Sequence, residues 1–162
     1  ISQHQLTQKN TTTMTDNKKE TIIDAFLEHC RKTPDNVYMT QPLGDGQVKD
    51  WTFQATLNEA MKMAGYLEAK GYPAGSRIAI CSKNCAEWII ADLAIWFSGH
   101  VSVPIYPTLT AKTVSFILEH SESRLLFVGK LDKKPWDEMK GGVPETLPKI
   151  SFPMKPEGEW GE

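Results

Sequence analysis

The side chains that could carry chemistry in this sequence are few and scattered. Its four histidines are His4, His29, His100 and His120. His4 lies in a polar leader, and two others lie toward the carboxyl ends of predicted helices, where a cation is favourable. Only His100, which follows a helix-ending glycine, is expected near a ligand-binding edge of a sheet. We therefore predict no catalytic histidine.

Recognisable catalytic and nucleotide-binding motifs do not occur in the sequence. It contains no G-x-S-x-G elbow, no G-x-x-x-x-G-K-[ST] phosphate loop and no H-E-x-x-H metal motif. The acidic residues Asp132, Asp137 and Glu138 lie among lysines, so we interpret them as a solvated cluster rather than an acid–base pair. The sequence thus predicts no catalytic, cofactor-binding or metal-binding residue of its own.

The three cysteines are Cys30, Cys81 and Cys85. The last two could be proposed as a metal pair, but no second cysteine pair or nearby histidine completes the four ligands of a structural zinc site. Buried thiols are the better interpretation. An odd number of cysteines gives no disulfide framework and fits a reducing compartment.

The best candidates for contact with a ligand lie in the segment 104–108, P-I-Y-P-T. A predicted strand ends there, and ligands gather at the carboxyl ends of strands in open parallel sheets. We therefore predict that the following residues lie near a substrate: Pro104, Tyr106, Pro107 and Thr108. The competing interpretation is that the two prolines only fix a loop beneath a neighbouring part of the protein.

The elements that must position this segment begin with a strand over 77–81, R-I-A-I-C. Its short apolar run is typical of a strand covered on both faces. Asn84 and Glu87 match a capping box, which predicts a helix over 85–97. That helix is apolar on nearly all sides, so we expect it to be mostly buried.

A second strand over 101–106 follows the glycine that ends this helix, Gly99. Pro104 and Pro107 confine the strand to a sheet edge, because proline cannot donate to a central ladder. Two strands joined by a helix in this way form a right-handed crossover.

The flanking segments extend the same alternation. We predict helices over 21–33, 52–71 and 110–121, a strand over 123–128, and a hairpin of strands 36–42 and 47–52 around the turn 44–46. The predicted fold class is α/β: a mostly parallel sheet with helices on both faces plus a small β-hairpin. We expect residues 1–15 to form a disordered leader, 16–128 the α/β unit, and 129–162 a weakly structured tail or linker with a short helix near 130–140.

Bulk properties exclude several classes of protein. The 162 residues carry 18 basic and 20 acidic side chains, so no electrostatic footprint for nucleic acid is present. No uncharged apolar run reaches the about eighteen residues of a spanning helix, and no secretory signal pattern begins the sequence. We therefore expect a cytoplasmic protein; peripheral membrane association of a longer parent stays open.

Residues 84–110, N-C-A-E-W-I-I-A-D-L-A-I-W-F-S-G-H-V-S-V-P-I-Y-P-T-L-T, resemble the N-terminal part of long-chain acyl-CoA synthetases. These enzymes belong to the adenylate-forming, AMP-binding superfamily. Their V-A-I-x-S-x-N-x-x-E-W pattern corresponds to 78–88, and G-x-V-x-V-P-x-Y-P-T corresponds to 99–108. The resemblance covers roughly 21–128, and it implies the N-terminal subdomain of such a synthetase.

The resemblance implies an acid–thiol ligase as the parent protein. Such ligases join a long-chain fatty acid to the α-phosphate of ATP, with Mg²⁺ present and pyrophosphate released, and then pass the acyl group to coenzyme A. Their T-S-G-T-T-G-x-P-K, Y-G-x-T-E and T-G-D motifs lie beyond the matched region, and none occurs in this sequence. We therefore expect the 162 residues alone to be inactive and to bind no cofactor tightly. Their expected partner is the remainder of the parent chain.

Two alternatives remain at this point. The parent could activate an aryl or amino acid, or the chain could be a free-standing, non-catalytic α/β interaction module. A truncated sheet would expose the apolar residues of 101–106 and 125–128, which would favour self-association of the fragment. Sequence leaves open the acid, the subunit number, membrane contact, the origin of residues 1–13, and whether the native chain continues past Glu162.

Overall fold

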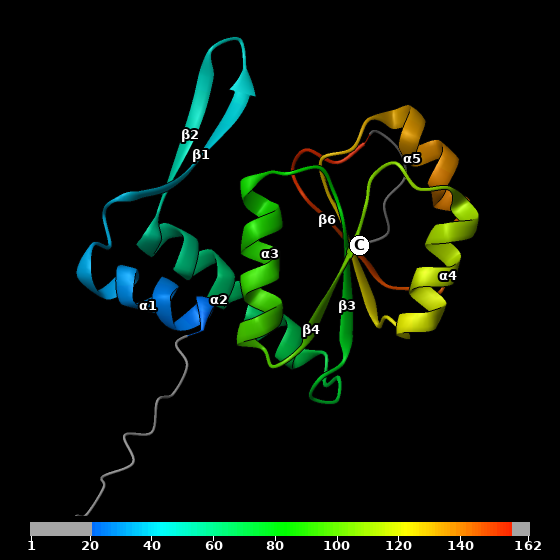
Figure 1. The fold of residues 1–162 in the computed structure, drawn as a ribbon, viewed down its shortest axis with the longest axis horizontal. Coiled ribbons are helices and arrows are strands. Elements are labelled where there is room, and N and C mark those ends of the chain that lie inside the picture. Colours follow the sequence, from blue (N-terminus) through cyan, green and yellow to red (C-terminus); the bar gives the residue numbers. More distant parts are fainter. Residues whose placement is uncertain (1–20, 157–162) are drawn as a thin grey trace, which may run out of the picture.

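The computed structural model describes residues 21–156, and a parallel sheet forms the centre of this part of the chain (Figure 1). The strands are β3 (Arg77–Cys81), β4 (Val101–Ile105), β5 (Leu125–Val128) and β6 (Lys149–Ser151). They lie in the order β4-β3-β5-β6, and every neighbouring pair is parallel. The predicted leader at 1–15 lies outside the described residues.

Helices cover both faces of the sheet, as the sequence predicts. On one face, α2 (Phe53–Ala69) and α3 (Ala86–Phe97) pack over Ile78, Ile80, Leu125 and Phe127. On the other, α4 (Ala111–Ser121) and α5 (Lys133–Met139) pack over Ala79, Cys81, Leu126 and Val128. Alternate residues of one strand point to opposite faces, so each strand contributes to two apolar cores. The predicted α/β class is confirmed.

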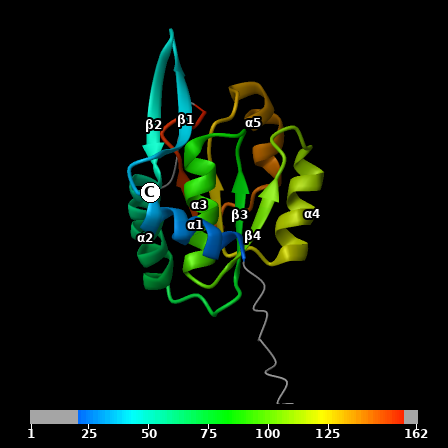
Figure 2. The same cartoon turned by 60° about the vertical axis from the view of Figure 1, so that its left-hand side comes forward.

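An outer layer packs against the far side of α3. It consists of α1 (Ile22–Lys32) and the antiparallel hairpin of β1 (Val37–Gly44) and β2 (Gln47–Thr52). The hairpin projects beyond the helices in two views (Figures 1 and 2). Its turn has positive φ at three consecutive residues, 99° at Gly44, 49° at Asp45 and 74° at Gly46, which explains the two glycines. Apolar side chains of this layer and of α3 form a third core around Phe26, Trp51 and Ile90.

The start of α3 differs from the sequence prediction. Its N-cap is Cys85, whose side chain makes no capping hydrogen bond, and Asn84 is exposed outside the helix. Instead, the Gln41 side chain reaches in from β1, and its Oε1 accepts a hydrogen bond from the backbone N–H of Ala86 at 3.0 Å. The predicted capping box is therefore wrong, because a buried amide 45 positions away along the chain supplies the acceptor.

The segment after residue 128 is more ordered than the sequence predicts. The short helix expected near 130–140 is present as α5 and is followed by a 3₁₀ turn, Lys140–Gly142. The strand β6 then pairs with β5, and the apolar side chains of Leu131, Trp136, Met139, Leu147 and Phe152 are buried. The prediction of a weakly structured tail is therefore wrong for residues 129–156, because these spaced apolar residues complete the two cores of the sheet.

The prediction that the apolar residues of 101–106 and 125–128 are exposed is right for the first segment and wrong for the second. Val101 and Tyr106, at the β4 edge, are 49% and 76% exposed. In contrast, every residue of β5 is buried, because β3 and β6 flank it and helices cover both faces. The apolar run at 125–128 is therefore not an exposed surface.

Candidate functional site

A hollow of about 700 Å³ lies at the carboxyl ends of the parallel strands. The segment after β3 contributes Ser82, Lys83 and Asn84, the end of β4 contributes Pro104 to Pro107, and Lys130 follows β5. Trp88, in the first turn of α3, completes the wall. This edge is where open parallel sheets bind ligands, because loops from several strands converge there without a ladder to block them.

Hydrogen bonds between two loops fix the floor of this carboxyl-edge hollow. The backbone N–H of Lys83 donates to the carbonyl oxygen of Lys130 at 2.9 Å, and the N–H of Lys130 donates to the Ser82 hydroxyl oxygen at 2.9 Å. The same hydroxyl donates to the carbonyl oxygen of Lys83 at 2.6 Å. The loops after β3 and β5 are therefore held as one rigid unit.

Gly129 makes this close approach possible. A Cβ atom at this residue would lie 2.3 Å from the Ser82 hydroxyl oxygen and 2.3 Å from a ring carbon of Phe152. Its N–H donates to the carbonyl oxygen of Cys81 at 2.9 Å, so the backbone cannot move away freely. Only glycine fits at the exit of β5.

The two charged side chains that line the hollow are lysines, Lys83 and Lys130. The Lys83 ammonium pairs with the Asp132 carboxylate at 2.5 Å, and both side chains are largely exposed. Lys130 is half-buried and makes no ion pair within residues 21–156. The amino end of α3 also opens here and adds partial positive charge. The arrangement suits an anionic group on a ligand.

Three of the four residues predicted to lie near a substrate line this hollow: Pro104, Tyr106 and Pro107. Thr108 instead lines a separate hollow of about 270 Å³ with Leu109 and residues of α5. Sequence reasoning missed Lys83 and Lys130. Both lysines follow closely after predicted strands, which could have marked them as candidates. Only the strand order shows that β3 lies between β4 and β5, so that the ends of these three strands are neighbours.

His100 does not lie at this edge. It precedes β4, so it is at the amino ends of the strands, where its ring is buried against the edge of Tyr72 with ring centroids 6.3 Å apart. The expectation that it lies near the ligand-binding edge is wrong, because the direction of the strand, not the nearby glycine, decides which end binds ligands.

The cysteines behave as buried thiols. Burial raises the pKa of the Cys81 thiol from an ordinary value of 9.0 to about 12, and burial also raises the pKa of Cys85. Cys81 contacts the Met139 sulfur at 3.7 Å. In the described part of the chain, no group of three or more histidine, cysteine or acidic side chains could hold a metal ion. Also within these residues, no helix is both long and apolar enough to cross a membrane.

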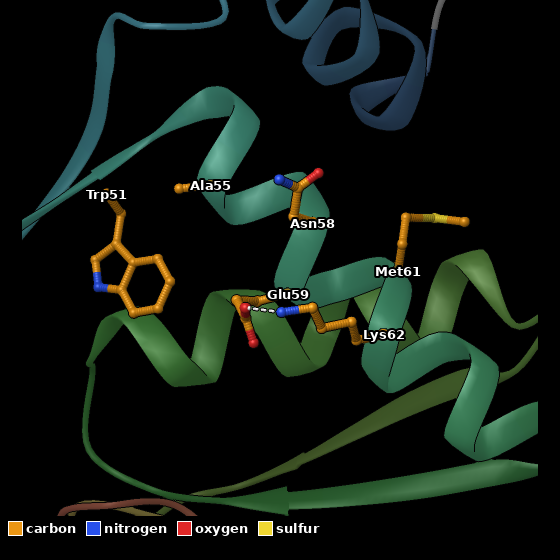
Figure 3. Close-up of a pocket in the computed structure, with 6 residues that line it drawn as sticks. All are labelled: Trp51, Ala55, Asn58, Glu59, Met61 and Lys62. Atoms are coloured by element: carbon orange, nitrogen blue, oxygen red, sulfur yellow. Dashed lines mark hydrogen bonds and ion pairs between the residues drawn. The ribbon is translucent and has the colours of Figure 1, made fainter.

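A second hollow lies on the outer surface of α2 (Figure 3). Trp51 forms one end of it, and residues of α2 line the rest. The only ion pair drawn there joins Glu59 to Lys62 at 2.6 Å, on exposed side chains. With its acid already paired, this surface offers less converging polar chemistry than the carboxyl-edge hollow.

Comparison with known proteins agrees with this geometry. Residues 26–155 match the family model described as AMP-binding enzyme. Over 108 residues the chain is 38% identical to the long-chain-fatty-acid–CoA ligase FadD15 of Mycobacterium bovis, an alignment that covers 67% of this chain and 18% of that protein. The chain spans less than a fifth of the length of the curated relatives it matches, for example 15% to 18% of three plant and mycobacterial ligases.

Solved structures share the fold. A fatty acyl-adenylate ligase from L. pneumophila, in complex with acyl adenylate and pyrophosphate, aligns with a TM-score of 0.65 at 21% identity, covering 83% of this chain and 23% of that one. VinN in complex with 3-methylaspartate aligns with a TM-score of 0.66 at 23% identity, covering 79% and 33%. The family match extends over most of the described sheet, its helices and the carboxyl-edge hollow. The chain therefore belongs to the AMP-binding enzyme family.

Proposed function

We propose that this chain is the N-terminal part of an ATP-dependent long-chain fatty acid–CoA ligase. The observation that carries the proposal is the 38% identity over 108 residues to a long-chain-fatty-acid–CoA ligase. The motif order from residue 78 to 110 supports the same assignment. The acids, ATP and coenzyme A are then ligands of the complete enzyme.

In this proposal the 162 residues supply one wall of the reaction site. Lys130 offers an ammonium group to an anionic part of the acid or the nucleotide, and Lys83 offers a second one that pairs with Asp132 in the absence of a ligand. The hydrogen-bonded loops fix the backbone from which both side chains extend. Pro104, Tyr106 and Pro107 form the apolar side of the same hollow. Among the described residues the lining of the hollow has two lysines and no carboxylate, so it suits an anion better than Mg²⁺, which is bound mainly through carboxylates and phosphates.

We further propose that the 162 residues alone form no acyl-adenylate. Phosphoryl-type transfer needs several positioned donors around the developing charge, and the sequence contains no Ser/Thr/Gly-rich phosphate loop. The test is carboxylate-dependent exchange of radioactive pyrophosphate into ATP by the pure chain. No exchange is expected; exchange that depends on a fatty acid would contradict this proposal.

The length of the native product tests the assignment itself. We expect the transcript to continue past the codon for Glu162 and to encode a Ser/Thr/Gly-rich loop soon afterwards. That longer protein, assayed with palmitate, benzoate and amino acids, distinguishes a fatty acid ligase from an aryl or amino acid activating enzyme. A stop codon after Glu162 would instead favour the non-catalytic interaction module.

Self-association is a separate proposal about the isolated chain. The edge strand β4 exposes Val101 at 49%, and Tyr106 just beyond it at 76%. An uncovered edge with apolar side chains favours pairing with another copy, although Pro104 limits how far a ladder extends. Sedimentation velocity at increasing concentration should show a rising mean mass, and a constant monomer would contradict this.

A further inference from the structure

A cavity of about 250 Å³, distinct from the carboxyl-edge hollow, lies between the base of the hairpin, α2, α3 and the end of β6. We name it the hairpin-base cavity. Exposed Lys49 and Pro153 belong to its lining, so it opens to solvent between the hairpin and the turn after β6. An engineered apolar cavity of about 150 Å³ holds benzene, so this space suffices for an indole ring. Its apolar walls include Met63, Ile90, Ala91, Phe127, Ile150 and Phe152.

The chain that leaves β6 turns at the rim of this cavity. Phe152 and Pro153 line the cavity, and the backbone N–H of Lys155 donates to the carbonyl oxygen of Phe152 at 3.1 Å, which closes the turn. The Lys155 ammonium also donates to the Ser151 hydroxyl oxygen at 3.2 Å. Figure 2 shows this end of the described chain, in red, beside the base of the hairpin. The residues that follow Pro156 are therefore attached close to the cavity wall.

Residues 157–162 lie outside the described part of the chain and have the sequence E-G-E-W-G-E, in which Trp160 is the only large apolar residue. Four residues span at most about 14 Å, and Pro153, only seven positions before Trp160 (160 − 153 = 7), already lines the cavity. A group on so short a tether acts at a millimolar effective concentration, so even weak complementarity suffices. Burial of a tryptophan removes about 150–250 Å² from water, which favours docking.

The charges at the cavity also suit this acidic segment. Lys49 lines the mouth and makes no ion pair within residues 21–156. A docked ring would bring the adjacent Glu159 toward this ammonium. The two acids of the lining are already compensated: Glu59 pairs with Lys62 at 2.6 Å, and Glu87 lies in the first turn of α3, where the amino end of the helix carries partial positive charge.

We propose that the indole ring of Trp160 packs into the hairpin-base cavity, against Met63, Ile90 and Ile150. The segment after β6 then clamps the base of the hairpin to the sheet unit, in addition to the contact that Gln41 makes with α3. The proposal depends on apolar packing, charge and chain length within these 162 residues, so it can fail without the proposed ligase activity failing, and the reverse.

Nuclear Overhauser effects (NOEs) in the 162-residue chain test this contact. The sequence has five tryptophans, and Trp160→Phe assigns the signals of Trp160. We expect NOEs from the Trp160 ring to the methyl groups of Met63, Ile90 and Ile150. In Trp160→Ala these methyl signals should shift, because the ring current is lost, and the backbone amides of residues 49–51 should exchange about three- to tenfold faster, because the hairpin base is no longer clamped.

Glu162→Ala is the matched control, since it changes the same segment beyond the ring and should keep the methyl shifts and exchange rates of the wild type. A mixture of ¹³C-labelled and unlabelled chains identifies the source of the ring, because the expected NOEs arise within one chain. NOEs between chains would make a second copy the occupant and overturn the proposal. So would a Trp160 ring that contacts none of the three methyl groups, or a Trp160→Ala chain in which their signals do not move.

Discussion

The two halves of the described chain are held together in different ways. The N-terminal half, residues 21–71, comprises the outer layer and α2 and begins its helices with local caps: Thr21 and Thr52 each accept a hydrogen bond from a backbone N–H three residues later. In the C-terminal half, residues 77–156, Thr110 caps α4 locally, but the sheet and its loops depend on partners distant in the sequence, such as Ser82 with Lys130 and β5 with β6. Contacts between near neighbours in the sequence can therefore form a hairpin and begin a helix. Neighbouring strands of a parallel sheet are instead joined by long crossover connections, so their contacts link residues far apart in the sequence.

Gln41 connects the two halves. It belongs to the hairpin of the outer layer, yet its side-chain oxygen receives the first N–H of α3. If the comparison is correct, changes at distant contacts should cost more stability than changes at local caps.

The largest effect is expected for Gly129→Ala. The added methyl group would lie 2.3 Å from Ser82 and from Phe152, and the free energy of unfolding should fall by about 3 kcal/mol. Urea denaturation measures this loss. The control is Gly65→Ala, which meets no atom within 4 Å inside α2 and should be stabilising by about 0.5 kcal/mol. Equal stability of the two variants would contradict the close approach at β5.

Gln41→Ala should cost about 2 kcal/mol, because it leaves the buried N–H of Ala86 unpaired. Asn84→Ala is its matched control. The sequence pattern makes Asn84 the cap of α3, whereas the structure leaves it exposed and outside the helix, so its cost should stay below about 0.5 kcal/mol. Urea denaturation measures both losses. A larger loss for Asn84→Ala than for Gln41→Ala would show that Asn84, and not Gln41, caps α3.

Stability should fall at high pH because of Cys81. Burial raises the pKa of this thiol from 9.0 to about 12, so the folded chain keeps a proton that the unfolded chain releases above pH 9. The stabilisation is fully present below pH 9 and is lost as the pH rises through about 12. Between pH 7 and pH 10 the loss is about 1.4 kcal/mol.

The variant Cys81→Ser isolates this effect, since serine does not titrate in the same range. Its unfolding free energy should decline less between pH 7 and pH 10 than that of the wild type, by about 1.4 kcal/mol. All other titrating groups are common to both proteins. Identical pH dependence in the two would show that Cys81 is not buried as described.

The smallest effect is expected at the local cap of α1. Thr21→Ala removes the hydroxyl that accepts the Asp24 N–H at 3.1 Å, and it should cost about 1 kcal/mol. Hydrogen exchange should show the loss mainly in the first turn of α1. Lys32→Ala, which removes an exposed ion pair with Glu28, should cost less than about 0.5 kcal/mol. A Thr21→Ala cost above that of Gln41→Ala would reverse the comparison.

The sequence predicts most of the fold because its strongest signals are short in range. The capping box of α1, the G-D-G turn and the apolar runs of β3 and β5 each lie within a few residues. The prolines also place β4 correctly at a sheet edge. The segment after 128 was underpredicted, because its buried side chains are separated by glycines, prolines and lysines and show no periodicity.

The candidate site is only half predictable for the same reason. Tyr106 and its neighbouring prolines follow a strand that the sequence shows, and they line the hollow. Thr108 turns away to another surface, and the lysines that give the hollow its charge come from two other loops. No pattern along the chain states that the ends of β3, β4 and β5 meet.

The sequence by itself determined the helices and strands up to residue 128, the edge position of β4 and the presence of the family motifs, because these depend on neighbouring residues. Tertiary structure alone decided that Gln41 caps α3, that Gly129 allows two loops to touch, and that Trp51 and Glu87 line one cavity. Each of these contacts joins residues at least 36 positions apart (87 − 51 = 36). Such contacts form only when the strand order and helix packing are fixed, since the cost of closing long loops is met by the whole core together.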